Sequence, residues 1–318
     1  MHTNSPGSRA LRAAGSALKP AMRSALWLLS VMVPVSFAVA ILRWSGVLTT
    51  VAGWLAPAFE IVGLPGEAAL AFLSAVFLNI YSALGVMSSI TLEHREVTIL
   101  ALMCLFTHNL PVETAVQKRT GSSAWAIVLL RLSGTVLGAL LLNLLLPGAA
   151  ASGGGGTAGT TQTRTGLVSA LAEWGQSAGV MIATVIAIIT ALMILQRLLR
   201  EFGVLEWLSR VLRPLLRAMG LPEETAFLWV VSNTLGLAYG SAVLIEEVEQ
   251  ERLSLRSSDL LNHHIAVSHS LLEDTLLFVA VGAYLGWIVI PRLLFATAVV
   301  WGKRGAGSWL IGGPVCSI

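Results

Sequence analysis

Long apolar stretches alternate with short polar segments along this chain. A helix needs about 20 apolar residues to cross the roughly 30 Å hydrocarbon core of a bilayer. The stretches that approach this length with few charges are Ser24–Leu42, Val97–Val112, Ser122–Leu146, Gly175–Leu195 and Leu260–Ile290, and Leu293–Trp301 completes the last span. This pattern predicts an all-α polytopic membrane protein with six crossings.

The composition agrees with this pattern. Hydrophobic residues make up 55% of the chain and charged residues 12%, whereas soluble domains carry about a quarter charged residues. Disorder, fibrous repeats and a water-soluble enzyme are therefore excluded. The net charge of +3 does not imply nucleic-acid binding, and the two cysteines form neither a disulfide framework nor a CxxC ligand pair.

One flexible linker divides the chain, because the segment from Pro147 to Thr165 contains four consecutive glycines and many Ser and Thr residues. On each side of it we expect one unit of similar size. The predicted organisation is a basic tail at 1–22, repeat 1 at 23–147, the linker at 148–170, repeat 2 at 171–304 and a C-terminal tail at 305–318.

The two units resemble each other at a nearly constant spacing. The segment Gly63-Leu64-Pro65-x-Glu67 recurs as Gly220-Leu221-Pro222-x-Glu224. Further on, Thr107-His108-Asn109-Leu110-x-x-Glu113-Thr114 recurs as Ser268-His269-Ser270-Leu271-x-x-Asp274-Thr275. Apolar chains match by chance at Leu or Val, but rarely at a His and an acid together, which indicates an internal duplication.

Basic residues predict the orientation of each unit, because they collect on the cytoplasmic side. The N-terminal tail carries Arg9, Arg12, Lys19 and Arg23 with no acid, and Arg197 and Arg200 follow the equivalent span of the second unit. The two first spans then run in opposite directions, so the repeats are inverted and each crosses an odd number of times. Both termini are expected in the cytoplasm.

This parity predicts that Ala68–Leu92 and Thr225–Ile245 are re-entrant hairpins rather than full spans. Each arm would have about 12 residues and a length of roughly 18 Å. Before each hairpin we expect an interfacial helix, at Gly46–Phe59 and Gly203–Met219. The second carries Arg210, Arg213 and Arg217 on one face, which is typical of a helix lying on the membrane surface.

The strongest candidates for function lie deep in the membrane. His108 follows Val97 by eleven residues, about 17 Å along a helix and thus near the bilayer centre, and Pro111 should break the helix there. Broken helices with midplane polar residues are how inverted-repeat transporters build their sites. The candidates from this segment and its repeat are His108, Asn109, Glu113, Thr114, His269, Ser270, Asp274 and Thr275. The alternative is that the histidines only join helices by hydrogen bonds.

Other polar positions complete the candidate set. Asn79 and Ser82 in the first hairpin, and Tyr239 and Ser241 in the second, fall where the hairpin tips are expected. Glu67 and Glu224 lie at the start of the hairpins. The sequence is consistent both with capping of a helix N-terminus by these acids and with their contact with a substrate or ion. For Arg131 and Arg292, snorkelling to the interface and pairing with a buried acid are equally open.

The arrangement resembles the Gate, or nucleoside-recognition, family of bacterial membrane proteins. The resemblance rests on the two Gly-Leu-Pro-x-Glu segments, the polar mid-hairpin stretches and the two His-x-Leu-x-x-acid segments. It implies a location in the bacterial cytoplasmic (inner) membrane. That family includes spore maturation proteins and is related to concentrative nucleoside transporters and the ferrous-iron transport protein B. The Asn-Glu pair that reads ribose in the nucleoside transporters is absent, since Asn79 precedes Ile80 and Asn233 precedes Thr234.

These features predict a secondary transporter of a small polar solute or ion that works by alternating access between inverted repeats. A non-transporting assembly partner, as the spore maturation resemblance implies, and a divalent-metal transporter are the alternatives. No enzyme is expected, because no Walker-type loop, HExxH or GxSxG motif occurs. The expected partners are the lipid bilayer and the substrate, and no nucleic acid is expected. Assembly into a homo-oligomer and assembly with a membrane partner subunit are both consistent with the sequence.

The only cofactor expected is a cation, either a coupling H⁺ or Na⁺ or a bound divalent metal. If the two units converge, His108, Glu113, His269 and Asp274 would bring two imidazoles and two carboxylates into one cavity. Such a ligand set suits zinc or iron(II) better than magnesium or calcium.

Overall fold

The computed structural model describes residues 6–147 and 166–305, and every regular element in these ranges is a helix. The first half contains α1 (Pro6–Trp44), α2 (Val47–Glu60), α3 (Ala68–Phe77), α4 (Ile80–Met87), α5 (His94–Thr107), α6 (Leu110–Arg119) and α7 (Ala124–Leu145). The second half contains α8 (Leu167–Glu201), α9 (Val204–Ala218), the 3₁₀ helix η1 (Glu223–Thr225), α10 (Ala226–Thr234), α11 (Leu237–Glu249), α12 (Leu255–Ser268), α13 (Glu273–Ala280) and α14 (Leu285–Gly305). The all-α class is confirmed for the described ranges.

The predicted terminal and linker segments fall only partly within these ranges. Helix α1 begins at Pro6, inside the segment expected to be a tail, and α8 begins at Leu167, inside the expected linker. Most of the linker (148–170) and of the C-terminal tail (305–318) lies outside the described residues.

Four helical segments of the described chain are long and apolar enough to cross a membrane. They are His94–Arg119, Ala124–Leu145, Leu167–Glu201 and Leu285–Gly305. The first of these combines α5 and α6, which follow each other through a break. Length and composition therefore place this chain among the polytopic membrane proteins, as its apolar pattern predicts.

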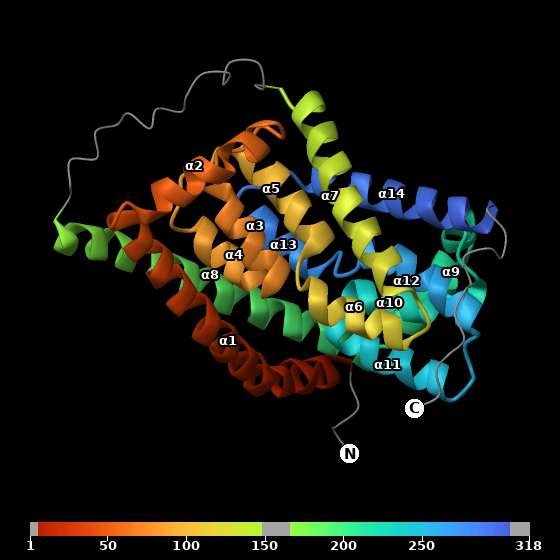
Figure 1. Ribbon diagram of the computed structural model, residues 1–318. Helices are drawn as coiled ribbons and strands as arrows, with labels where there is room; N and C mark the ends of the chain where they lie inside the picture. Colours follow the sequence, from red (N-terminus) through yellow and green to blue (C-terminus); the bar gives the residue numbers. More distant parts are fainter. Residues whose placement is uncertain (1–5, 148–165, 306–318) are drawn as a thin grey trace.

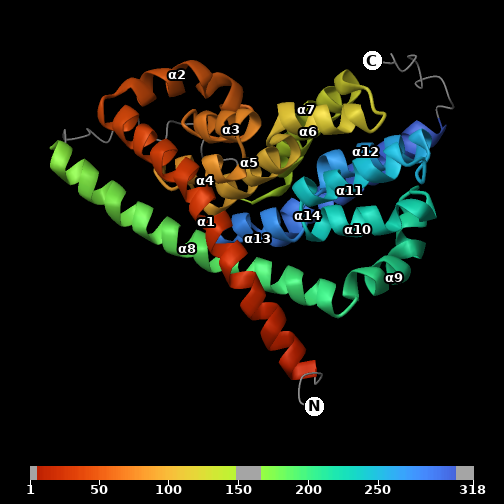
Figure 2. The same cartoon turned by 90° about the horizontal axis from the view of Figure 1, so that it is seen from below.

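The two longest helices, α1 with 39 residues and α8 with 35, cross each other along one side of the molecule (Figures 1 and 2). At their contact the Trp174 indole N–H donates to Ser36 Oγ at 3.2 Å, and the rings of Phe37 and Trp174 meet edge to face with centroids 4.9 Å apart. Each long helix leads into a shorter one, α2 or α9, through a glycine with positive φ, Gly46 or Gly203.

Two pairs of short helices fold back on themselves, α3 with α4 and α10 with α11. At the first turn the Asn79 side chain accepts a hydrogen bond from the Ser82 backbone N–H at 2.9 Å, which caps α4. At the second turn Gly236 has a φ of 78°, which glycine adopts without steric cost. Helices α3 and α4 have 10 and 8 residues, so each is about 15 Å long or less, half the thickness of the hydrocarbon core.

Two helices are interrupted in the middle of the molecule. Helix α5 ends at Thr107 and α6 begins at Leu110, with Pro111 in its first turn, where no intrahelical N–H donor is needed. Asn109 between them has a φ of 50°. The matching break separates α12 from α13 and contains no proline, and Ser270 there has a φ of 53°.

The expected apolar span Leu260–Ile290 is not one continuous helix, because α12, α13 and the start of α14 divide this segment. Gly282 lies at the second interruption with a φ of 105°, and a Cβ atom there would lie 2.6 Å from the His94 imidazole. The Tyr284 backbone N–H then donates to Thr98 Oγ1 at 3.0 Å. Helix α14 consequently runs through the boundary expected at Leu293.

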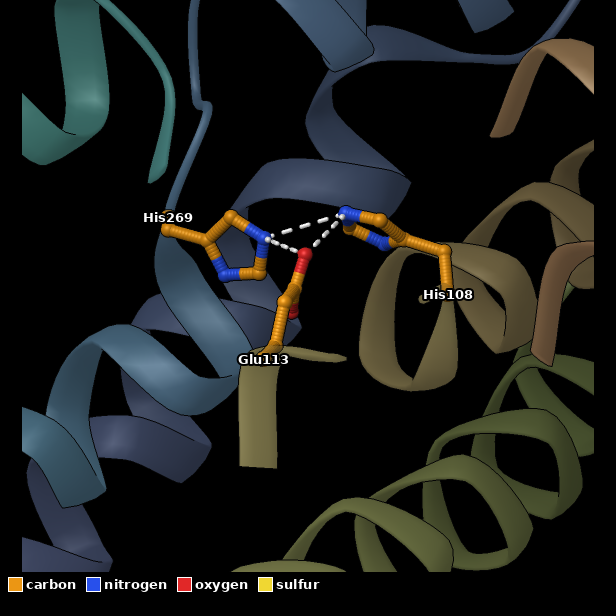
Figure 3. Close-up of side chains that lie close together, drawn as sticks. All are labelled: His108, Glu113 and His269. Carbon is orange, nitrogen blue, oxygen red and sulfur yellow. Dashed lines mark hydrogen bonds and ion pairs between the residues drawn. The ribbon is translucent and has the colours of Figure 1, made fainter. Parts of the chain in front are cut away.

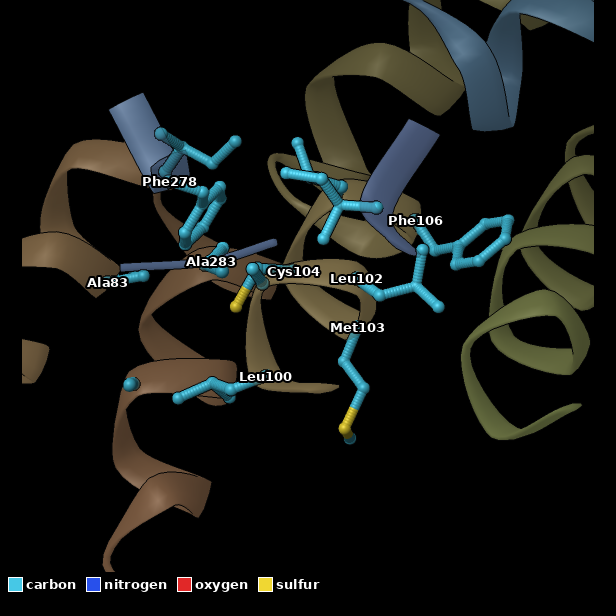
Figure 4. Close-up of a cluster of buried hydrophobic side chains, with 14 of the residues drawn as sticks. Ala83, Leu100, Leu102, Met103, Cys104, Phe106, Phe278 and Ala283 are labelled. Carbon is cyan, nitrogen blue, oxygen red and sulfur yellow. The ribbon is translucent and has the colours of Figure 1, made fainter. Parts of the chain in front are cut away.

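The apolar core surrounds α5, whose side chains pack against α4, α13 and the turn before α14 (Figure 4). Helix α7 approaches closely because Gly134 has no side chain. A Cβ atom at Gly134 would lie 2.8 Å from the Phe295 ring and 3.0 Å from the Phe106 ring. This close approach brings Arg131, one turn earlier on α7, against the end of α5.

We expect Gly134→Ala to lower the stability of the protein by about 1–3 kcal/mol, since an added methyl group overpacks a filled core. The matched change Gly302→Ala lies on α14, where a Cβ atom meets nothing within 4 Å, and should be neutral or slightly stabilising. The measurement is the thermal unfolding midpoint of both variants in detergent. Equal midpoints would contradict the packing of α7 against α5.

Candidate functional site: a buried histidine–carboxylate cluster

The two helix breaks meet at a pair of histidines. His108 follows the end of α5 and His269 follows the end of α12, and their Nε2 atoms lie 3.0 Å apart (Figure 3). Glu113, from the first turns of α6, places its Oε1 atom 3.3 Å from both Nε2 atoms. All three side chains are buried, so segments far apart in the sequence form one polar centre.

Backbone contacts determine the tautomer of each imidazole. His108 Nδ1 lies 3.1 Å from the Cys104 carbonyl oxygen, and His269 Nδ1 lies 2.7 Å from the Ile265 carbonyl oxygen. A carbonyl oxygen only accepts hydrogen bonds, so each Nδ1 carries a proton and donates it. In the neutral rings the Nε2 atoms therefore keep their lone pairs, and these lone pairs face the same point.

Carboxylates surround this point from both halves of the chain. The second oxygen of Glu113, Oε2, forms an ion pair with Arg131 Nη1 at 2.8 Å. Asp274 from α13 lies on the other side, with its Oδ2 atom 3.4 Å from His108 Nε2. Of the four residues that the sequence suggested as one ligand set, the structure places potential ligand atoms of His108, Glu113 and His269 within 4.8 Å of one another, and Asp274 contacts His108 beside them.

The two arginines are fully buried, which excludes snorkelling to the interface. Arg131 donates from Nε to the Phe106 carbonyl oxygen at 2.7 Å and from Nη2 to that of His108 at 2.6 Å. These carbonyl groups lost their helical partners at the break, and the guanidinium also favours the negative end of the helix dipole. The arginine therefore stabilises the interruption of α5 as well as pairing with Glu113.

Arg292 does the same for α12, with one difference. It donates from Nε to the Val267 carbonyl oxygen at 2.9 Å and from Nη2 to that of His269 at 2.5 Å. Among the described residues no ion pair joins its Nη1 atom to Asp274, whereas Arg131 Nη1 pairs with Glu113. Pairing with a buried acid is thus realised for Arg131 and not for Arg292.

The neutral candidates next to the histidines connect the breaks to the hairpins. The Asn109 backbone N–H donates to the Ala75 carbonyl oxygen at 2.8 Å, and that of Ser270 donates to the Ser232 carbonyl oxygen at 3.1 Å. Thr114 and Thr275 are buried, and their hydroxyl oxygens have no hydrogen-bond partner in the described structure.

The remaining candidates lie outside the histidine cluster. Asn79 and Ser82 bond to each other at the start of α4, and the side chains of Tyr239 and Ser241 are outside the described residues. Glu224 accepts a hydrogen bond from Ser257 Oγ at 2.6 Å, near the start of α12. Glu67 precedes α3 and makes no capping hydrogen bond with its side chain.

Sequence reasoning missed one half-buried pair beside the cluster. The Tyr81 hydroxyl donates to Glu273 Oε1 at 2.5 Å and thereby joins α4 of the first half to α13 of the second. The available signal was that Glu273 directly precedes Asp274 and Tyr81 lies at the expected hairpin tip. Glu273 has no acidic counterpart in the first half, where Val112 occupies the equivalent position, so the repeat alone could not single it out.

A separate apolar cavity of about 510 Å³ lies between α4, α5, α8 and α13. Its walls include Met87, Val97, Met181 and Leu277, with Gln176 and Thr184 among the few polar contributions. None of the four cluster residues lines it, so the polar centre and this cavity are distinct features.

Comparison with known proteins gives two matches. A model of the nucleoside recognition (Gate) family matches residues 182–280. The "uncharacterized membrane protein YvoD" of Bacillus subtilis (strain 168) is 30% identical over 280 residues, which cover 88% of this chain and 89% of that protein. This chain belongs to the nucleoside recognition (Gate) family. No solved structure matches the chain significantly.

Membership confirms the resemblance drawn from the paired motifs and establishes a membrane protein. The matched range runs from within α8 to the end of α13 and includes His269, Ser270 and Asp274. His108 and Glu113 lie outside it, so half of the cluster comes from a part of this Gate-family protein beyond the matched range.

The two acids are expected to differ in their effect on stability. Glu113→Gln leaves the buried Arg131 charge without its ion pair, and such a loss typically costs about 3–5 kcal/mol. Asp274→Asn breaks no ion pair with an arginine and should cost markedly less. Unfolding midpoints of both variants in detergent measure the difference. A larger loss for Asp274→Asn would contradict this assignment of the pairs.

Proposed function

We propose that this protein is a secondary transporter of a small polar solute or ion, with its binding site at the histidine–carboxylate cluster. The observation that carries this proposal is the meeting of two broken helices at a buried ionisable centre. Ionisable side chains and unwound backbone are costly in a bilayer, and they occur where a substrate or ion pathway requires them. The cluster has the chemistry of such a site.

Equivalent contacts occur within each of the two halves and support a pair of repeats. Each arginine bonds the same two carbonyl groups of its own broken helix, each histidine bonds the carbonyl group four residues before it, and each left-handed residue bonds the preceding hairpin. Such agreement in both side-chain and backbone bonds favours a duplicated unit. In this proposal α3 with α4, and α10 with α11, are the re-entrant hairpins of the two repeats.

Contacts between helix ends support inversion of the repeats. Ends expected in the cytoplasm lie together, since Arg119 pairs with Glu249 at 2.6 Å and Lys303 with Asp259 at 2.6 Å. At the opposite end His94 Nδ1 lies 2.9 Å from the Gly282 carbonyl oxygen. The start of α5 and the start of α12 thus lie at opposite ends of the molecule, as antiparallel repeats require.

In this proposal, alternating access occurs by rocking of one repeat against the other around the cluster. At the cytoplasmic end the buried Asn262 amide donates to Thr120 Oγ1 at 2.9 Å and to Ser122 Oγ at 3.0 Å, which joins α12 to the segment after α6. We propose that these bonds close the path to the cytoplasm and that they separate when the site opens inward. The location proposed is the bacterial inner membrane.

The transport proposal predicts solute flux in proteoliposomes that contain the purified full-length protein. The panel covers nucleosides, to which the family description refers, together with organic anions and divalent metal ions. His108→Ala should lower the uptake of the transported class at least about tenfold, because the loss of about 1.4 kcal/mol of binding corresponds to this factor. The variant Trp125→Ala, at a side chain that is 76% exposed, serves as the control.

Absence of flux for every class, with folded protein in the vesicles, would contradict transport. Co-purification of a stoichiometric membrane partner in that case would favour the second candidate, an assembly subunit. In that role the cluster would only join the two halves, and His108→Ala would lower thermal stability without any effect on flux.

The proposed topology predicts which positions react with a membrane-impermeant thiol reagent in intact cells. In a Cys104→Ser, Cys316→Ser background, Val168→Cys at the start of α8 should be labelled from outside. Arg119→Cys at the end of α6 should be labelled only after the membrane is opened. Both residues are exposed, so accessibility reports the side of the membrane. Labelling of both in intact cells would contradict the inverted arrangement.

A further inference from the structure

The two Nε2 atoms at the centre of the cluster direct their lone pairs at the same point when both imidazoles are neutral. They lie 3.0 Å apart, and hydrogen bonds to the Cys104 and Ile265 carbonyl oxygens hold the ring protons on Nδ1. Two lone pairs that face each other at this distance repel. A cation at the point where they converge turns this repulsion into attraction, and the Glu113 carboxylate, 3.3 Å from both atoms, strengthens the attraction.

The distances among the donor atoms fit a small tetrahedral ion. Zinc binds imidazole nitrogen and carboxylate oxygen at about 2.0–2.2 Å, so neighbouring ligand atoms of a tetrahedral site lie roughly 3.3–3.5 Å apart. The observed separations are 3.0 Å between the histidines, 3.3 Å from each to Glu113 Oε1, and 3.4 Å from His108 to Asp274 Oδ2. His108, His269 and Glu113 offer three ligand atoms that all lie within 4.8 Å of one another.

Outer contacts hold these ligands in position. Both imidazoles donate their Nδ1–H to backbone carbonyl groups, the usual arrangement that fixes the tautomer and orientation of a metal-binding histidine. The Glu113 oxygen that does not face the histidines pairs with Arg131 Nη1 at 2.8 Å. The ligand atoms are therefore preorganised before any ion arrives.

The donor atoms of the cluster also suit a transition-metal cation. Three buried or half-buried carboxylates, Glu113, Asp274 and Glu273, lie opposite two buried guanidinium groups, Arg131 and Arg292. Of these carboxyl groups, those of Glu113 and Asp274 supply the oxygen donors around the two neutral imidazoles. Imidazole nitrogen with few oxygens selects a transition metal, whereas magnesium and calcium prefer six or more oxygen ligands.

We infer that His108, His269 and Glu113 bind one divalent transition-metal ion such as zinc(II) or iron(II), with Asp274 beside His108 and outside this set of three ligands. This inference rests on the proposed function in one respect, because it makes the metal ion the transported substrate. The binding site itself depends only on the geometry of the three side chains.

The first test is metal binding by the purified full-length protein. After incubation with zinc and desalting, elemental analysis should find one zinc per chain, and X-ray absorption should show nitrogen and oxygen ligands at about 2.0–2.1 Å with imidazole features. His269→Gln keeps a polar side chain of similar reach that zinc does not favour, and it should weaken zinc binding at least about 100-fold. His94→Gln, on the exposed surface, should bind as the wild type does.

Unchanged zinc binding in His269→Gln, or a wild-type spectrum without imidazole ligands, would overturn the inference. The spectrum of the wild type decides the matter even if the variant fails to fold. Zinc flux into proteoliposomes then separates the two proposals. Tight zinc binding without flux of any solute would leave the metal site and refute transport, whereas flux of an organic solute without zinc binding would refute the metal site alone.

Discussion

Unwound backbone in an apolar interior is the constraint on which this structure depends. A helix that stops inside a membrane leaves carbonyl groups without partners, and each such group costs several kcal/mol in hydrocarbon. Arg131 and Arg292 supply the missing donors from the neighbouring helices α7 and α14. Only with these bonds do the breaks persist, and the breaks in turn direct His108 and His269 towards each other. The close contact at Gly134 is part of the same arrangement, since it lets Arg131 reach α5.

Sequence reasoning found the elements that leave a local signal. Pro111 marks the first break, and the recurrence of a histidine with an acid five residues later identifies all four members of the cluster. The break after Ser268 carries no proline and depends on tertiary bonds to Ser232 and Arg292, so its position could not be derived locally. The interruption at Gly282 also involves a tertiary contact, because a Cβ atom there would lie 2.6 Å from the His94 ring of another helix.

The differences between the two halves also depend on tertiary contacts. They follow from the one methylene group by which Glu113 is longer than Asp274. Glu113 is long enough to pair with Arg131 and still reach both imidazoles. Asp274 is shorter by one carbon, and it lies beside His108 without an ion pair to Arg292. The sequence shows the Glu-to-Asp difference, but which arginine keeps its partner depends on the distance between helices. The link from Tyr81 to Glu273 likewise requires knowing that α4 and α13 meet.

The breaks have a further consequence for the electric field at the centre. Helices α5 and α12 end there, and α6 and α13 begin there, so two negative and two positive macrodipole ends converge. Each end is equivalent to about half an elementary charge, and the four contributions largely cancel. The helices therefore do not favour either sign of ion. The sign is determined by the ionised side chains alone.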